Sequence, residues 1–228
     1  MNNFDYVAEN IRQIKADVEE AKAKYRSADE RIDIMAVTKT VPPEIVNTAI
    51  ENGINLLGEN RVQEYLSKKD FYDKSAEVHF IGHLQTNKMK YIIENVSMIQ
   101  SVDRIELAKE LSHQCLKLKI KKDILIEVNI GDEENKSGFL KDGLIDAIYE
   151  MSELPNISIK GLMAIPPKCG SEKFFYEMQK LFIDIRDKNI DNIIMCILSM
   201  GMSSDYIPAI KYGSNLIRIG TKLFGARK

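Results

Sequence analysis

The sequence has few of the residues that build disulfide frameworks and structural metal centres. Among its 228 residues there is no tryptophan, and there are three cysteines and three histidines. Cys115, Cys169 and Cys196 are far apart, odd in number and without a CxxC spacing, which argues against a disulfide framework and a structural zinc site. Reduced thiols are the default in the cytoplasm, where we expect this protein to reside. The apolar run around Cys196 predicts a thiol buried in the core.

The histidines do not form a credible metal-binding pattern either. His79 and His83 stand four residues apart, a spacing that metal ligands use on a helix. The segment Val78–His83 has the composition of a strand, however, so the spacing loses that meaning. We therefore predict no metal site.

A strong charge of one sign and a long hydrophobic run are also lacking. The formal net charge is −2, which argues against a dedicated nucleic-acid surface. No apolar run is long enough to span a bilayer. The sequence is instead 44% hydrophobic and 29% charged, which suits a large core beneath a charged surface. We therefore expect neither a nucleic-acid partner nor a membrane partner.

Short apolar runs typical of buried strands alternate along the chain with amphipathic stretches typical of helices. The expected strands are Asp33–Thr38, Asn55–Leu57, Val78–Ile81, Met98–Ser101, Asp123–Asn129, Ser158–Met163, Ile193–Leu198 and Leu216–Ile219. The expected helices are Glu44–Glu51, Arg61–Lys68, Asn87–Glu94, Arg104–Leu118, Gly138–Ser152, Glu172–Lys188 and Ser204–Lys211. A further helix is expected before the first strand, from about Phe4 to Arg26, because apolar residues recur there every three or four positions.

This alternation predicts an α/β fold. Repeated βα units imply parallel strands, and eight of them in a chain of this length point to a closed (β/α)8 TIM barrel. A doubly wound open sheet is the alternative, although it would need fewer strands. Because no linker or repeat divides the chain, we expect a single domain over residues 1–228 with an extra N-terminal helix.

Lys39 stands where the first predicted strand ends, shortly before the proline pair at 42–43. A lysine at the end of a buried strand is costly unless it has a partner or takes part in covalent chemistry. In a barrel this end of the strand carries the active site, and Lys39 shares strand parity with Met35 and Val37. A partly desolvated amine can attack an aldehyde and form a Schiff base. The alternative is a lysine that reaches the barrel rim or pairs with a carboxylate.

Two turns of small residues follow the seventh and eighth predicted strands. The first is Leu198–Asp205, and its serines precede a predicted helix whose N-terminus favours an anion. The second contains Gly220, which lets backbone N–H groups approach a ligand, and Thr221, which offers a hydroxyl. Taken singly, these residues are equally consistent with plain turns and helix caps. Together they favour a phosphate site, because barrels often bind phosphate at these two loops.

Arg218 lies within the eighth predicted strand and shares parity with Leu216 and Gly220. That parity can direct its side chain inward, and a buried arginine needs an acceptor. One candidate acceptor is the ring nitrogen of a pyridine cofactor. A structural salt bridge is an equally good reading of the same position.

Six segments carry a resemblance to a known family: Ala36–Lys39, Gly58–Arg61, His79–Lys88, Gly161–Met163, Leu198–Ser203 and Arg218–Thr221. With these motifs, in order over nearly the whole chain, the sequence resembles the pyridoxal phosphate homeostasis protein family. One departure is Val78, where members often have tryptophan. We expect that difference to change packing rather than the cofactor site.

The resemblance implies a barrel like the N-terminal domain of alanine racemase, with pyridoxal 5'-phosphate (PLP) held as a Schiff base on Lys39. It also implies that Arg218 faces the pyridine nitrogen. The phosphate is then expected to be bound by Ser203, Gly220 and Thr221. The ring pocket is expected to be lined by Asn60, Met163, Ser199 and Met200. His83 is expected to be either a neighbour of the cofactor or a rim histidine without a catalytic role.

The resemblance implies a role in intracellular PLP and amino-acid homeostasis rather than robust catalysis. Alanine racemase uses two bases, and the second comes from an added β domain for which this chain has no room after its last strand. One lysine moves protons on one face only, and an arginine at the ring nitrogen weakens the cofactor as an electron sink. We expect a carrier that shields PLP and passes it to apo PLP enzymes. We also expect a monomer, because the missing domain removes a dimer interface.

Two enzymatic alternatives stay open at this point. The first is a PLP-dependent amino-acid racemase or another weak PLP enzyme, which would use the same site. The second is a barrel aldolase that uses Lys39 on a sugar phosphate, although the sequence offers no acid/base partner for it. A visible absorption band that depends on Lys39 distinguishes a PLP-binding protein from the aldolase.

Overall fold

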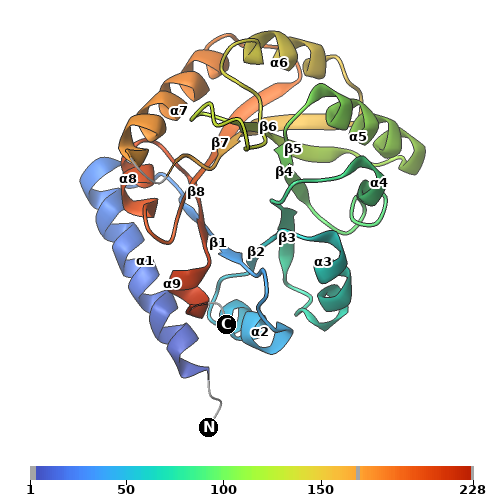
Figure 1. Ribbon diagram of the computed structural model, residues 1–228. Helices are drawn as coiled ribbons and strands as arrows, with labels where there is room; N and C mark the ends of the chain where they lie inside the picture. Colours follow the sequence, from blue (N-terminus) through green and yellow to red (C-terminus); the bar gives the residue numbers. More distant parts are fainter. Residues whose placement is uncertain (1–3, 168–169, 227–228) are drawn as a thin grey trace.

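Eight parallel strands close into a barrel in chain order, from β1 to β8 (Figure 1). The computed structural model describes residues 4–167 and 170–226. Its strands are β1 Asp33–Val37, β2 Leu56–Glu59, β3 Glu77–Phe80, β4 Met98–Val102, β5 Lys122–Val128, β6 Ile157–Ala164, β7 Ile193–Met202 and β8 Leu216–Ile219. The barrel closes through parallel pairing of β1 with β8. The predicted (β/α)8 barrel is confirmed.

Helices surround the barrel and connect the strands (Figure 1). They are α1 Asp5–Tyr25, α2 Pro43–Glu51, α3 Val62–Lys68, α4 Thr86–Met89, α5 Ile105–Leu118, α6 Leu144–Ser152, α7 Ser171–Arg186, α8 Tyr206–Lys211 and α9 Thr221–Phe224, with a 3-10 helix η1 at Lys69–Phe71. The predicted extra helix before the first strand is confirmed as α1. Two short elements, η1 and α9, were not predicted.

Two helices, α4 and α6, are much shorter than the sequence predicted, and backbone hydrogen bonds explain both cases. After α4 the chain continues in tight turns, in which the N–H of Tyr91 bonds to the carbonyl of Lys88. Before α6, Phe139 pairs with the end of β5: its N–H donates to the carbonyl of Glu127 at 2.8 Å. That extended pairing competes with helix formation, so α6 begins at Leu144 rather than Gly138.

The strands alternate between side chains that fill the barrel and side chains that pack beneath the helices. Met35 and Leu216 form an interior cluster with Ile81, and Val37 packs against it. The shared face predicted for Met35 and Val37 is therefore confirmed, and it is the barrel interior; the inward direction considered for the eighth strand is also found. A second interior cluster contains Met98, Leu125 and Met163.

The prediction that Cys196 is buried was wrong, because its side chain is exposed. The first half of β7 is covered on one face only, so residues alternate there between partly buried and exposed positions. Cys115 is buried on α5. Cys169 lies outside the described residues.

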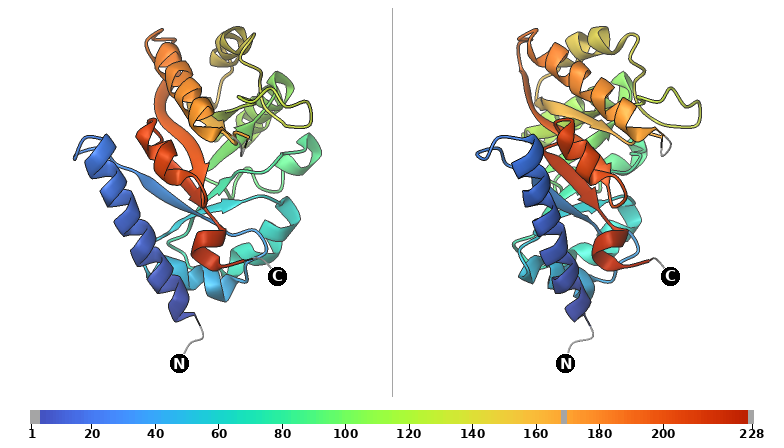
Figure 2. Two further views of the ribbon diagram at one scale, coloured as in Figure 1. Left: turned by 60° about the vertical axis from the view of Figure 1, so that its left-hand side comes forward. Right: turned by 90° about the vertical axis from the view of Figure 1, so that its left-hand side faces the viewer.

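Helix α1 lies along the outside of the barrel, next to α8 and α9 (Figures 1 and 2). Its buried face consists of Val7, Ile11, Ile14, Val18 and Ala21. A polar contact joins the three helices: Lys222 Nζ donates to Asp17 Oδ2 at 2.6 Å, and the hydroxyl of Tyr206 donates to the same oxygen. The two loops that end β7 and β8 are thus held from outside by a helix from the beginning of the chain.

Within residues 4–167 and 170–226, no helix is both long enough and apolar enough to cross a membrane. The same described residues contain no cluster of three or more His, Cys, Asp or Glu side chains that could hold a metal ion.

Candidate functional site

Lys39 lies in the turn that follows β1, and its side chain is half-buried. The turn is closed by a hydrogen bond of 2.9 Å from the N–H of Val41 to the carbonyl of Thr38. Thr40 adopts a φ of 63°, which a β-branched residue rarely takes. In the described part of the chain, Lys39 forms no ion pair and no side-chain hydrogen bond. A strained and tightly bonded turn therefore presents an amine that the protein itself does not engage.

A buried polar network holds this turn from below. The Thr38 hydroxyl donates to Oε1 of Glu59 at 2.7 Å, and the Tyr72 hydroxyl donates to the same oxygen. Lys68 Nζ donates to the carbonyl of Thr38 at 3.1 Å and also pairs with Glu64. Burial raises the pKa of the Glu59 carboxyl above its ordinary value, although the hydrogen bonds from Tyr72 and Thr38 oppose this shift. The backbone directly before Lys39 is thereby fixed.

Arg218 points into the barrel from β8, the strand next to β1. Its Nη1 donates to Ser199 Oγ at 2.6 Å, and its Nη2 donates to the carbonyl of Ala164 at 2.8 Å. The guanidinium is fully buried, and this burial lowers its pKa to about 10 even though Glu127 and Asp205 favour the charged form. Because the structure gives it no paired carboxylate, the salt bridge considered from the sequence is absent among the described residues.

The loops after β7 and β8 meet at Ser203. Its hydroxyl oxygen accepts hydrogen bonds from the backbone N–H groups of Gly220 and Lys222, both at 3.2 Å. Thr221 lies between these two residues and is exposed. Gly201 is required in the β7 loop, because it has a φ of 90° and an added Cβ would lie 2.5 Å from the Cβ of Ala209. The expected phosphate residues Ser203, Gly220 and Thr221 are therefore neighbours in space.

The four residues expected to line the ring pocket occupy different environments. Asn60 follows β2, and its Oδ1 is buried without a hydrogen-bond partner among the described residues. Met163 and Ser199 are completely buried inside the barrel on β6 and β7. Met200 packs in the main hydrophobic cluster beneath the helices, so only its backbone can contribute to the strand ends.

His83 lies in the loop after β3 at the edge of a cavity of about 240 Å³, which Asn60 and Glu127 also line. Its Nδ1 lies 2.9 Å from Asp103 Oδ2 and 3.3 Å from Ser137 Oγ. Both partners use the same ring nitrogen, so this is not the Ser-His-Asp arrangement of hydrolases. Burial, reinforced by Asp103, raises the pKa of Glu127 to about 7 although Arg218 opposes the shift.

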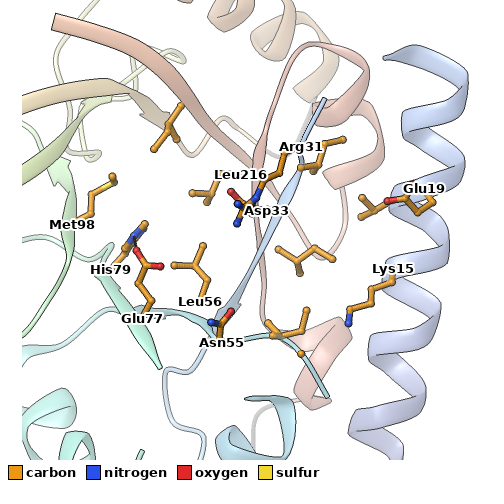
Figure 3. A pocket seen from close by; sticks show the side chains of 16 residues that line it. Lys15, Glu19, Arg31, Asp33, Asn55, Leu56, Glu77, His79, Met98 and Leu216 are labelled. Atoms are coloured by element: carbon orange, nitrogen blue, oxygen red, sulfur yellow. Dashed lines mark hydrogen bonds and ion pairs between the residues drawn. The ribbon is translucent and has the colours of Figure 1, made fainter. Parts of the chain in front are cut away.

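Two further cavities lie at opposite ends of the barrel. One of about 390 Å³ lies between the ends of β1 and β8, where Val37, Thr40 and Gly220 line it; Lys39 is not among its lining residues. The other, of about 680 Å³, opens at the amino ends of the strands, and Glu77 and His79 line it (Figure 3). The predicted site residues belong to the first of these ends.

Three side chains around this end were missed from the sequence: Glu59, Gln100 and Glu127. Each is a polar residue inside an apolar strand run, and Gln100 and Glu59 are completely buried. Gln100 contacts Ser199, because the Ser199 hydroxyl donates to its Oε1 at 2.8 Å. Gln100 and Glu127 share strand parity with Met98 and Leu125 of the interior, so a polar residue with inward parity is the signal that could have identified them. Glu59 has the parity of Leu57, which packs beneath the helices, and no such signal marks it.

Comparisons with known proteins place this geometry in a class. Residues 5–228 match the family model described as "Alanine racemase, N-terminal domain". Alanine racemase from Corynebacterium glutamicum superposes with a TM-score of 0.74 at 14% identity, over 98% of this chain and 62% of that one. The class is therefore a barrel of the alanine racemase N-terminal type, as the resemblance predicted.

More similar relatives define the family. A "Pyridoxal phosphate homeostasis protein" from Aquifex aeolicus is 38% identical over 225 residues, which cover 96% of this chain and 98% of that protein. PipY of Synechococcus elongatus, whose structure was solved with PLP bound, has a TM-score of 0.83 at 27% identity, covering 96% of this chain and all of that one. The chain belongs to the family of pyridoxal phosphate homeostasis proteins.

Proposed function

We propose that this protein binds PLP as a Schiff base on Lys39 and holds it for intracellular PLP and amino-acid homeostasis. Lys39 would supply the amine for this bond, which forms with loss of water. PLP, when bound, would supply an aldehyde and a pyridine ring, and the protein's own residues would hold the ring and the phosphate in position.

The register between β1 and β8 is the observation that carries the proposal. Ala36 pairs with Ile219, so the chain leaves the barrel at Lys39 and at Gly220–Thr221 on adjacent strands. An amine that has no partner among the described residues thus lies at the end of the strand next to one that carries N–H and hydroxyl groups. PLP needs this combination, because its aldehyde and its phosphate are substituents of one small ring.

The donor set fits the cofactor in its remaining parts. Ser203 Oγ and the N–H groups of Gly220 and Lys222 already converge, and a phosphate oxygen is an acceptor of the same kind. Arg218 has five N–H donors, and its two contacts to Ser199 and Ala164 leave others for a ring nitrogen. Asn60 Oδ1, which has no partner within residues 4–167 and 170–226, offers one more polar contact.

The arrangement favours retention over turnover. A permanently charged donor at the ring nitrogen keeps that nitrogen unprotonated, which weakens the ring as an electron sink. The name of the Aquifex relative and the bound PLP of the cyanobacterial relative agree with such a role. In this proposal, apo PLP enzymes are the recipients and the protein acts as a monomer, which size-exclusion chromatography coupled to light scattering would check.

The deciding experiment is an absorption spectrum of the purified protein after incubation with PLP. We expect a visible band that borohydride abolishes, with the added mass located on the peptide that contains Lys39. The band should be lost in Lys39→Ala and kept in Lys15→Ala, a matched variant whose lysine lies on α1 near the opposite end of the barrel. A wild-type protein that stays colourless would exclude the proposal and leave the aldolase reading.

A weak PLP enzyme, such as an amino-acid racemase, is the second candidate. It is favoured by the cavity that His83 and Glu127 share, since a carboxyl with a pKa of about 7 can exchange protons near neutral pH. Circular dichroism of L- and D-amino acids incubated with the protein tests it. Sustained interconversion that is lost in Lys39→Ala would establish the enzyme in place of the carrier.

A further inference from the structure

A continuous chain of hydrogen bonds crosses the interior of the barrel. It begins where Arg218 Nη1 donates to Ser199 Oγ at 2.6 Å, and Ser199 donates in turn to Gln100 Oε1 at 2.8 Å. Gln100 Nε2 lies 2.8 Å from His79 Nδ1, and His79 Nε2 lies 3.3 Å from Glu77 Oε1. The first four residues are at most 4% exposed. Four strands, β8, β7, β4 and β3, contribute to this chain.

The two ends of this hydrogen-bond chain, Arg218 and Glu77, face opposite ends of the barrel. Arg218 is the member that faces the proposed cofactor. Glu77 belongs to the start of β3, and its side chain is 54% exposed in the 680 Å³ cavity, where Figure 3 draws it beside His79. Ser97 also donates to Glu77 Oε1, at 3.1 Å. The buried chain therefore connects Arg218 to solvent on the far side.

The direction of every bond in the chain is determined by its neighbours. Ser199 has one hydroxyl proton and donates it to the Gln100 carbonyl, so its oxygen must accept the hydrogen bond from Arg218. With its carbonyl toward Ser199, Gln100 turns its amide nitrogen toward His79. His79 Nδ1 must then be an unprotonated acceptor, and its ring proton sits on Nε2, directed at the Glu77 carboxylate.

We propose that Gln100 and His79 are positioning residues for the proposed cofactor's ring, acting through Ser199 on Arg218. The inference rests on the proposed function. Gln100 fixes the Ser199 hydroxyl so that its lone pairs, rather than its proton, face the guanidinium. That contact, together with the carbonyl of Ala164, holds Arg218 with its remaining N–H groups available to the ring nitrogen.

The reverse orientation shows why the link matters. A proton on His79 Nδ1 would require the Gln100 oxygen, which turns the amide nitrogen of Gln100 toward Ser199. Ser199 would then receive donors from both Gln100 and Arg218 and would lose the acceptor for its own proton. A buried hydroxyl proton without an acceptor is costly, so Arg218 would be held less firmly in that arrangement.

The first test measures the network in the protein without PLP. Long-range ¹⁵N–¹H spectra of the histidine side chains report which ring nitrogen carries the proton. We expect His79 in the Nε2–H form in the wild type, assigned by comparison with His79→Gln. A protonated Nδ1 in the wild type would overturn the inference, whatever the outcome for PLP.

The second test uses PLP-loaded protein. Gln100→Leu removes the hydrogen bonds to Ser199 and His79, and we expect a shifted visible band and roughly tenfold weaker PLP retention, because Arg218 is then held less firmly. Gln100→Glu keeps the acceptor for Ser199 and should restore most of the retention. Ser101→Ala is the matched control, because Ser101 is equally buried on β4 but donates to the carbonyl of Gly82 at 2.6 Å; its spectrum should stay wild-type.

The outcomes are separable from those of the proposed function. A wild-type protein without a visible band defeats the proposed function, while the first test still decides the network. A normal wild-type band with an unchanged spectrum and unchanged retention in Gln100→Leu defeats the positioning role alone. If Gln100→Leu does not fold, Gln100→Glu decides. We expect it to retain PLP nearly as well as Ser101→Ala does. Retention as low as in Arg218→Ala would contradict the positioning role.

Discussion

The Thr38 hydroxyl donates a hydrogen bond of 2.7 Å to Oε1 of Glu59, and this contact links the first two strands directly beneath Lys39. The carbonyl of Gly58 lies 3.3 Å from the same hydroxyl oxygen. Glu59 receives a second donor from Tyr72 on the same oxygen. The position of Lys39 thus depends on a carboxyl group that never reaches solvent.

Replacing Thr38 with valine tests that dependence. The change preserves shape and removes the hydroxyl, so Glu59 keeps a single donor on Oε1. We expect the free energy of unfolding to fall by roughly 1–2 kcal/mol in urea titrations, together with weaker PLP retention. Thr48→Val is the control, because that hydroxyl bonds only to the carbonyl of Glu44 within α2; equal losses in the two variants would contradict the special role of Thr38.

The strained backbone at Thr40 gives a prediction of opposite sign. Its φ of 63° costs a β-branched residue about 1–2 kcal/mol, whereas glycine adopts it freely. The entropy that glycine loses on folding offsets part of this gain. Thr40→Gly should therefore raise the free energy of unfolding by roughly 0.5–1 kcal/mol. Thr40→Ala should give no such gain, since alanine keeps the strain. Thermal unfolding of both variants measures the difference, and a less stable glycine variant would be the contrary result.

Glu127 predicts a pH dependence of stability. Its pKa is about 7 in the folded protein and has an ordinary value of 4.5, so the folded state binds more protons between these values. Its contribution is therefore fully present below pH 4.5 and falls by about 3 kcal/mol as the pH rises through 7. Glu127→Gln should remove that fall when the two unfolding curves are subtracted. Parallel curves across this pH range would show that the carboxyl is ionised throughout.

Arg218 and Thr221 should differ sharply in their importance for PLP. Arg218 is buried and hydrogen-bonded, and its loss also leaves Ser199 and the carbonyl of Ala164 without their donor. We expect Arg218→Ala to weaken PLP binding by roughly 10- to 100-fold. Thr221→Ala should weaken it by only about threefold, because Thr221 is exposed. Equilibrium dialysis gives both dissociation constants. Equal values would count against the ring-nitrogen assignment.

The barrel could be predicted because buried parallel strands are nearly continuous apolar runs, and such runs are visible in a sequence. That Met35 and Val37 share one face followed from strand parity, whereas only the closed barrel shows that this face is the interior. Helix ends were less accessible: α6 begins six residues later than predicted because Phe139 pairs with β5, a contact between elements that local periodicity does not encode.

The positions of Lys39 at the end of β1 and of Arg218 in the barrel interior could be predicted, because strand parity and the cost of a buried charge identified these residues. Gln100 and Glu59 were missed because a single polar residue in an apolar strand also suits an exposed position. Their partners, Ser199 and Thr38, come from other strands. Such pairings arise only once the barrel closes, so no local pattern reports them.

The pairing of β1 with β8 has a consequence for folding during synthesis on the ribosome. The Lys39 turn and the Gly220–Thr221 turn belong to the first and last strands, and α1 reaches across to α8 and α9. Contacts between such distant segments form late, because the chain must close a long loop before they contribute. A nascent chain that has already exposed Lys39 therefore lacks the rest of the proposed site until β8 has been made. In the proposed function, capture of the aldehyde would thus require the closed barrel, and chains without β8 would not compete for it.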